Sequence, residues 1–338
     1  MDVRSLLASC IVKTKIHKIY SSIYHNVMPS VTVLAYHRIK NINSDFLYDR
    51  ELISASTASF EAQIKYIKNN FNVITCKELS DAIYSNKKLP KKSLLITFDD
   101  GFDDNYINAY PILKSHNIPA AFFVSSGYID SQLPYWFDLI YMVYTQQNNE
   151  VAYNILISIL NSSGCENIFN IHDVFRFMKK IPNTLREDIV SKLMQDLRNN
   201  NIEIHTEQSK PMSWSQISEM SNNGFDIGSH TVNHPILATC NTHEMNYELL
   251  QSKKTIEKSV GKNIISIAYP NGGVSDYNAE TIELAKKAGY KIGFSYITGR
   301  NYMNNIEAFD LKRLHVEEFT NLDNFICKLS IPRLFDQT

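Results

Sequence analysis

Two short strings carry the side chains of this chain that could do chemistry. Residues 97–101 read TFDDG and end an apolar run with two adjacent carboxylates, Asp99 and Asp100. Residues 230–234 read HTVNH and place two imidazoles, His230 and His234, four positions apart. Because side chains alternate along extended backbone, the two carboxylates point in different directions, so one can bind a metal ion while the other accepts a proton. The pattern predicts a site that activates water.

One carboxylate and the two histidines form a donor set that suits a catalytic Zn²⁺ ion, with the fourth position left for water. Gly228-Ser229 before the histidines and Pro235 after them indicate a turn from a strand into a loop, where site residues are often found. Taken alone, each string has a plainer interpretation: a solvated Asp-Asp-Gly turn, and two surface histidines. Their occurrence together favours the metal site.

Size and charge narrow the class of protein. The chain has 338 residues, 44% of them hydrophobic, which is enough for one large α/β domain or two small ones. Its net charge of −1 argues against the strongly basic surface that nucleic-acid binding requires. Five scattered cysteines, none in a CxxC pair, argue against a disulfide framework or a zinc ribbon and indicate a reducing compartment.

Apolar strands alternate with amphipathic helices along most of the chain. Apolar runs predict strands at 31–36, 71–75, 93–98, 120–124, 225–229, 264–269 and 290–294. Helical spacing predicts helices at 59–69, 77–84, 105–116, 244–260 and 279–288, with Gly289 as the last C-cap. This alternation implies a parallel sheet with right-handed crossovers. Because polar residues recur just after strands, we expect an α/β barrel or distorted barrel, with its site at the carboxyl ends of the strands.

Two segments depart from this alternation. Residues 128–210 read as mostly helical and are expected to form a helical insertion in a barrel that spans residues 31–338. Residues 1–30 read as a basic helical extension, which could lie on an anionic membrane or simply pack against the barrel. No run reaches the roughly 20 apolar residues of a membrane span, and no secretory signal is evident. The expected location is therefore the cytoplasm, with peripheral contact at the inner membrane as an option.

The chain resembles the polysaccharide deacetylases of carbohydrate esterase family 4, which carry the NodB homology domain. TFDDG and HTVNH match the first two motifs of that family in full. LAYHRI at 34–39, SFEAQ at 59–63 and AYPNG at 268–272 are similar to it as well. The resemblance covers about residues 31–130 and 211–318. It implies the distorted (β/α) barrel of the NodB type.

The resemblance also implies a role for each matching residue. Asp99 would be the general base that deprotonates water, and Asp100 would bind the metal ion together with His230 and His234. The ion would polarise the acetamide carbonyl and lower the pKa of its water toward about 7. The backbone N–H of Asn271, in the third motif, would stabilise the oxyanion.

Two positions depart from the family's pattern. Ala268 stands where the family often has an arginine that orients the catalytic aspartate, and Arg313 is expected to fill that role from a neighbouring strand. The general acid of the family is usually a histidine in a late Leu-x-His motif, which His315 matches imperfectly. His37, at the end of the first strand, is a second candidate for a histidine at the site. Either histidine could instead be structural.

The expected activity is metal-dependent removal of the N-acetyl group from an amino sugar in a glycan or glycan precursor, with release of acetate. The expected ion is Zn²⁺, with Co²⁺, Ni²⁺ and Mn²⁺ as alternatives. The expected partner is an N-acetylated sugar, an oligosaccharide or a lipid-linked precursor. Tyr36, Tyr269 and Trp214 are candidates for a sugar-binding groove, although a buried core position is the better explanation for any one of them. Two other functions stay open: an O-acetyl esterase, and a degenerate member that binds glycans without hydrolysis.

Overall fold

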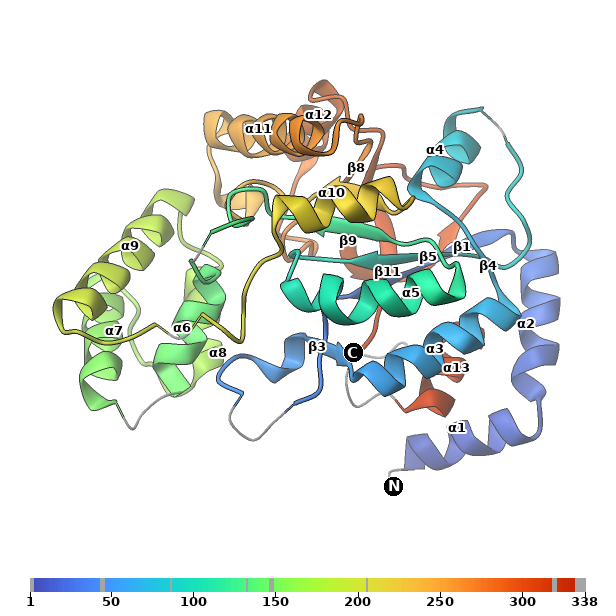
Figure 1. The fold of residues 1–338 in the computed structure, drawn as a ribbon, viewed down its shortest axis with the longest axis horizontal. Coiled ribbons are helices and arrows are strands. Elements are labelled where there is room, and N and C mark those ends of the chain that lie inside the picture. Colours follow the sequence, from blue (N-terminus) through green and yellow to red (C-terminus); the bar gives the residue numbers. More distant parts are fainter. Residues whose placement is uncertain are drawn as a thin grey trace.

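The computed structural model describes residues 3–42, 46–85, 87–131, 133–145, 149–204, 206–317 and 321–331 (Figure 1). Seven of the strands in these residues form a closed parallel barrel in the order β1-β11-β9-β8-β7-β6-β5, and β5 pairs back with β1. They are β1 (Ser30–Tyr36), β5 (Ser93–Phe98), β6 (Ala121–Val124), β7 (Asp226–Ser229), β8 (Ser266–Ala268), β9 (Ile292–Thr298) and β11 (Leu311–His315). The predicted (β/α) barrel is therefore confirmed.

The remaining strands extend or flank the barrel. β4 (Asn72–Val73) is parallel to β5, and β10 (Asn301–Tyr302) is antiparallel to β1. β2 (Arg38–Ile39) and β3 (Ile53–Ala55) form a separate two-stranded sheet beyond the end of β1. Of the predicted strand at 71–75, the two residues Asn72 and Val73 form β4, in register with Ser93 and Leu94 of β5.

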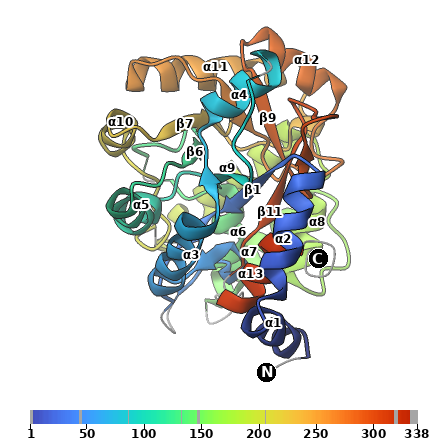
Figure 2. The ribbon, with the colours of Figure 1, turned by 90° about the vertical axis from the view of Figure 1, so that its right-hand side faces the viewer.

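Helices surround the barrel on its outer side (Figure 2). They are α3 (Thr57–Asn70), α4 (Cys76–Ser85), α5 (Tyr110–His116), α10 (Trp214–Asn222), α11 (Thr242–Val260) and α12 (Ala279–Lys287). The apolar stripes of these helices pack on strand side chains, those of α4 in a smaller cluster with Val31 and Leu95 and those of the other five in one large core. Their starts follow from local sequence: in the capping box of α11, for example, Asn241 accepts from the N–H of Glu244 and Glu244 accepts from that of Asn241.

A helical insertion separates β6 from β7. It comprises α6 (Trp136–Thr145), α7 (Glu150–Ser162), α8 (Ile171–Met178) and α9 (Asn183–Asn199), and it lies to one side of the barrel in Figure 1. These helices share an apolar cluster of their own that includes Leu139, Leu156, Val174 and Leu193. The insertion can therefore hold a fixed shape while its first helix contacts the barrel.

Two further helices, α1 (Val3–Lys13) and α2 (Ile16–Val27), precede β1. They pack against α13 (Leu322–Ser330), where Ala8 and Cys327 share a small apolar cluster. Across the described residues, we find no helix that combines the length and the apolar character needed to cross a bilayer.

Candidate active site

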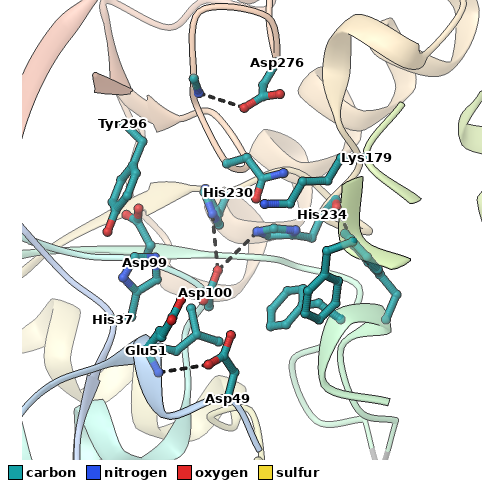
Figure 3. A pocket seen from close by; sticks show the side chains of 16 residues that line it. His37, Asp49, Glu51, Asp99, Asp100, Lys179, His230, His234, Asp276 and Tyr296 are labelled. Carbon is teal, nitrogen blue, oxygen red and sulfur yellow. Dashed lines mark hydrogen bonds and ion pairs between the residues drawn. The ribbon is translucent and has the colours of Figure 1, made fainter. Parts of the chain in front are cut away.

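A cavity of about 380 Å³ lies beside the carboxyl ends of β1, β5 and β7. Six of the residues predicted from the sequence line it: His37, Asp99, Asp100, His230, His234 and Asn271. Their strands bring them together, since in a parallel barrel the residues that follow each strand meet at one end. Figure 3 shows Asp99, Asp100 and the two histidines grouped around one point.

Asp100, His230 and His234 form a compact donor set. The Nε2 atoms of His230 and His234 lie 3.4 and 3.2 Å from Oδ1 of Asp100, and one ligand atom from each residue falls within 4.8 Å of the others. All three side chains are buried. Burial opposes ionisation of Asp100, but the imidazoles of His230 and His234 beside it hold its pKa well below the ordinary value.

The set fits a divalent cation because of how His230 is held. Its Nδ1 lies 2.8 Å from the carbonyl oxygen of Ala268, to which it donates in the neutral ring. That tautomer leaves the lone pair of Nε2 facing Asp100, as a metal ligand requires. A carboxylate and two imidazole nitrogens suit Zn²⁺ or a neighbouring first-row ion.

The loop that carries the histidines is strained and braced. Thr231 and His234 have φ values of 68° and 54°, in the left-handed region that side chains with a Cβ rarely adopt. Glu248 of α11 holds this loop: its carboxylate accepts from the N–H groups of Val232 at 2.7 Å and Asn233 at 2.9 Å. Burial, the largest influence, raises the pKa of Glu248 to about 7. Nothing in the sequence marked Glu248, because it lies inside an ordinary amphipathic helix.

Asp99 is held by Arg313 through both carboxylate oxygens. The two terminal nitrogens of Arg313 lie 2.8 Å from Oδ1 and 2.7 Å from Oδ2, and its Nε donates to the carbonyl of Ser295 at 2.7 Å. Both side chains are buried. Burial acts to raise the pKa of Asp99, but Arg313 and then His230 outweigh it, so the pKa lies below its ordinary value. Arg313 thus lies in contact with Asp99, and its orienting role stays a prediction.

His37 lies beside Asp99 at the same end of the barrel (Figure 3). Its backbone is fixed on both sides, since its N–H donates to Oγ of Ser54 at 2.9 Å and its carbonyl accepts from Nδ2 of Asn105 at 2.7 Å. The imidazole contacts the ring of Tyr296 edge-on, with 5.3 Å between centroids. His37 therefore faces the cavity from a rigid support.

His315, the other candidate acid, does not line the cavity. Its ring stacks on the ring of Tyr296, with 3.5 Å between the centroids. Tyr296, unlike His315, lines the cavity. Burial, together with the positive charge of Arg313, lowers the pKa of His315 to about 3. The imidazole is consequently neutral near pH 7 and holds no second proton that it could give away.

Asn271 occupies a turn that needs unusual backbone. Asn271 and Gly272 have φ values of 55° and 65°. A Cβ at Gly272 would lie 2.6 Å from the backbone nitrogen of Tyr296, so only glycine lets the turn approach β9 this closely. The side-chain Nδ2 of Asn271 is buried and has no hydrogen-bond partner among the described residues. An unpartnered donor in the cavity wall is available to an oxyanion or a substrate oxygen.

Two tyrosines predicted to contact sugar lie elsewhere. Tyr36 is fully buried, and its hydroxyl donates to Gln63 of α3 at 2.9 Å. Tyr269 is also fully buried, and its hydroxyl donates to the carbonyl of Phe309 at 3.1 Å. Both rings belong to the barrel core rather than to the cavity, in contrast to the expectation, because they face the packed helices. Trp214 packs against the same core.

Besides Tyr296 of β9, the aromatic side chains that line the cavity come from the insertion. Trp136 donates from its Nε1 to the carbonyl of His234 at 3.2 Å, and the ring of Phe137 lies 5.2 Å from that of His234. Phe175 and Lys179, also from the insertion, line the cavity as well. Asp49 and Glu51, from the segment between β2 and β3, complete its lining. Sequence patterns did not point to these residues, beyond the expectation that the insertion could bind substrate.

Comparison with known proteins agrees with this geometry. A family described as polysaccharide deacetylase matches residues 86–293. The chain is 25% identical over 262 residues to the protein YxkH of Bacillus subtilis (strain 168), an alignment that spans 77% of this chain and 62% of YxkH. It is 27% identical over 278 residues to a poly-beta-1,6-N-acetyl-D-glucosamine N-deacetylase of Staphylococcus aureus (strain N315), over 79% of this chain and 72% of that protein.

A solved structure shares the fold. The deacetylase PplD of Streptococcus pyogenes, in complex with acetate, superposes with a TM-score of 0.60 at 21% sequence identity. The match covers 89% of this chain and 99% of PplD. The similarity in fold therefore extends over most of the chain.

Proposed function

The chain belongs to the polysaccharide deacetylase family, and we propose that it hydrolyses the N-acetyl group of an amino sugar in a glycan and releases acetate. The observation that carries this proposal is the Asp99–Arg313 pair beside the donor set of Asp100, His230 and His234 in one cavity. A carboxylate kept ionised next to a three-ligand metal site suits hydrolysis by activated water. The relative from S. aureus is named as an N-deacetylase of poly-beta-1,6-N-acetyl-D-glucosamine, which supports an N-acetylated glycan as the substrate.

A divalent ion, for which we propose Zn²⁺, would be held by Asp100, His230 and His234 and would act as a Lewis acid toward the acetamide carbonyl and lower the pKa of water. Asp99 would accept the proton of the attacking water. Arg313 donates to both oxygens of the Asp99 carboxylate, so the remaining lone pairs of that carboxylate keep a constant direction. Asn271 would donate to the oxyanion that develops as the carbonyl is attacked.

We propose that His37 is the general acid that protonates the leaving amine. It lines the cavity beside Asp99, whereas His315 is covered by Tyr296 and is neutral near pH 7. Expulsion of an amine requires a proton before the C–N bond breaks, so the donor must face the substrate.

Acetate release tests this function directly. The purified protein, loaded with Zn²⁺, would be incubated with N-acetyl oligosaccharides and with O-acetylated sugars of the same backbone. Acetate from the N-acetyl substrates supports the proposal. Release from the O-acetyl substrates alone would identify an esterase, and binding of the glycan without release would identify a non-catalytic member.

We also propose a peripheral contact with an anionic membrane at the end of the molecule that carries α1 and α2. Residues 3–31 contain four basic and no acidic residues. Four more lysines, within residues 87–92, line a cavity together with Pro29 and Ser30 just after α2. Exposed apolar side chains lie on these two helices and just after them: Leu6, Leu7, Ile16, Ile19 and Met28. Lysines combined with exposed aliphatic side chains suit lipid headgroups and the acyl boundary below them.

Vesicle co-sedimentation tests the membrane contact. Binding to vesicles that contain phosphatidylglycerol, but not to pure phosphatidylcholine, is expected, and the triple change of Lys13, Lys15 and Lys18 to Glu should abolish it. The matched control changes Lys192, Lys254 and Lys258, which are exposed on α9 and α11, to Glu. Equal loss in both variants would contradict the assigned surface. Whether the protein works on the cytoplasmic side stays a prediction.

A further inference from the structure

Three consecutive aromatic residues at the start of the insertion contact two of the proposed metal ligands. The hydroxyl of Tyr135 donates to the backbone carbonyl of Asp100. Nε1 of Trp136 donates to the backbone carbonyl of His234 at 3.2 Å. The ring of Phe137 meets the imidazole of His234 edge-on, with 5.2 Å between the centroids. We call Tyr135, Trp136 and Phe137 the aromatic clamp, because they join the insertion to the two ligands.

The imidazole of His234 depends on such contacts because it lacks the anchor that His230 has. Nδ1 of His230 lies 2.8 Å from the carbonyl oxygen of Ala268. Nδ1 of His234, in contrast, is buried and has no hydrogen-bond partner among the described residues. A metal-binding imidazole is usually oriented by a hydrogen bond at its second nitrogen. At His234 the edge-on contacts of Phe137 and of Tyr135, whose ring centroid lies 5.9 Å away, take the place of that bond.

The two carbonyl groups that the clamp binds belong to residues with unfavourable backbone conformations. Asp100 and His234 have φ values of 74° and 54°, in the left-handed region. Residues with a Cβ keep such conformations only where the surrounding structure holds them. The carbonyl of Asp100 also accepts a longer bond of 3.4 Å from the N–H of Ser125. The hydrogen bonds from Tyr135 and Trp136 are therefore direct supports of the two ligands.

The indole of Trp136 is held in turn by other helices of the insertion. Cζ of Arg186, a buried residue of α9, lies 5.4 Å from the centre of the indole ring. Phe175 of α8 meets the same indole edge-on, with 6.3 Å between the centroids. A guanidinium over the face of a tryptophan is attracted to the ring, and more strongly when it is buried. The place of Trp136 therefore depends on how α8 and α9 pack.

We propose that the aromatic clamp positions the metal ligands Asp100 and His234, so that the packing of the insertion sets the affinity of the barrel site for its metal ion. Tyr135, Trp136 and Phe137 are then positioning residues, which act through the ligands and not on the ion. The inference rests on the proposed function, which supplies the ion. It gives the insertion a second task besides lining the cavity.

The experiment measures the Zn²⁺ affinity of the full chain by competition with a chelator of known affinity. Tyr135→Phe removes the hydroxyl and keeps the ring, and Trp136→Phe removes the N–H donor. Each should lower the Zn²⁺ affinity about tenfold, within the range of about 10–100-fold that is typical for residues that support metal ligands. Arg186→Met, which removes the cation over the indole, should lower the affinity several-fold, and Arg186→Lys should restore part of it.

Two matched substitutions lie away from the ligands. Tyr110→Phe also removes the hydroxyl of a buried tyrosine, in this case one that donates to Glu219 of α10 at 3.0 Å. Trp214→Phe changes the other tryptophan of the chain, which packs against the barrel core. Both variants should keep the Zn²⁺ affinity of the wild type. Thermal unfolding of the metal-free proteins shows how far each substitution affects stability alone.

Wild-type Zn²⁺ affinity in both Tyr135→Phe and Trp136→Phe would overturn the positioning role and leave the clamp as packing only. An equal loss in Tyr110→Phe or Trp214→Phe would overturn it as well, because the loss would then follow from general destabilisation. Wild-type affinity in Arg186→Met would overturn the dependence on α9. The proposed function fails on a separate result: a wild type that binds Zn²⁺ but releases no acetate from any N-acetyl substrate, whatever the affinities of the variants.

Discussion

Arg313 grips both carboxylate oxygens of Asp99, at 2.8 and 2.7 Å, although 214 positions separate the two residues in the chain. The pair exists because β11 closes the barrel next to β1, and β1 pairs on its other side with β5. Barrel closure thus brings a cation from the last barrel strand to the carboxylate that follows β5.

A substitution at Arg313 should impair the orientation of Asp99 without affecting metal binding. Arg313→Lys keeps the charge but cannot form the two parallel hydrogen bonds. We expect kcat to fall by about 10²-fold, a typical contribution of a positioned base, with the metal content unchanged. Steady-state kinetics and metal analysis of the same preparation check both points. A Lys variant with full kcat would show that the paired geometry does not matter.

Arg313→Met should also destabilise the fold. It leaves Asp99 buried without its partner, and loss of one member of a buried ion pair costs about 3–5 kcal/mol. Denaturant unfolding of this variant beside Arg313→Lys measures the difference.

The two histidines near the site should respond differently to substitution. His37→Gln is expected to lower kcat on N-acetyl substrates by about 10²-fold and to spare an O-acetyl substrate with a better leaving group. His315→Gln should act mainly on stability, since Tyr296 covers the ring. Kinetics on both substrate types together with thermal unfolding distinguish these effects. Loss of activity in the His315 variant with unchanged folding would move the acid role to His315.

Glu248 should govern metal affinity without contacting the metal. Glu248→Ala removes the acceptor for the N–H groups of Val232 and Asn233. These hydrogen bonds hold the loop between His230 and His234. Loss of such a supporting residue typically costs about 10–100-fold in metal affinity. Titration with Zn²⁺ against a chelator measures the affinity, and Glu248→Gln, which retains an acceptor, is the matched control. Unchanged affinity in the Ala variant would contradict the bracing role.

The raised pKa of Asp138 should make the free energy of unfolding depend on pH. Burial raises the pKa of this carboxyl to about 7, although Arg38 opposes the rise. The folded protein keeps the proton that the unfolded chain loses near pH 4, so the unfolding free energy falls as the pH rises from about 4 to about 7. The slope from one such group is at most about 1.4 kcal/mol per pH unit.

Asp138→Asn should remove this component of the slope. The amide oxygen can still accept from Ser209, which hydrogen-bonds Asp138 in the native protein. Urea unfolding of both proteins at pH 5 and pH 8 provides the comparison. A wild type and a variant with the same pH dependence would show that Asp138 ionises normally.

The sequence predicted the parts of this protein that depend on local pattern. The apolar runs before Asp99 and His230 are strands, and the residues just after them face one cavity, as parallel topology requires. Patterning failed for Tyr36 and Tyr269, because a strand buried on both faces gives no alternation that tells the helix-facing side from the site. Glu248 and the walls made by Phe175 and Asp49 depend on how distant segments pack, which no short motif records.

The most direct test of the account pairs Asp99→Asn with Asp100→Asn on a substrate that releases acetate. The account predicts that Asp99→Asn binds one divalent ion per chain and releases no acetate, because it lacks the base but keeps every ligand. Asp100→Asn should lose both the ion and the activity. Substantial turnover by Asp99→Asn at full metal occupancy would contradict the assignment of Asp99 as the base.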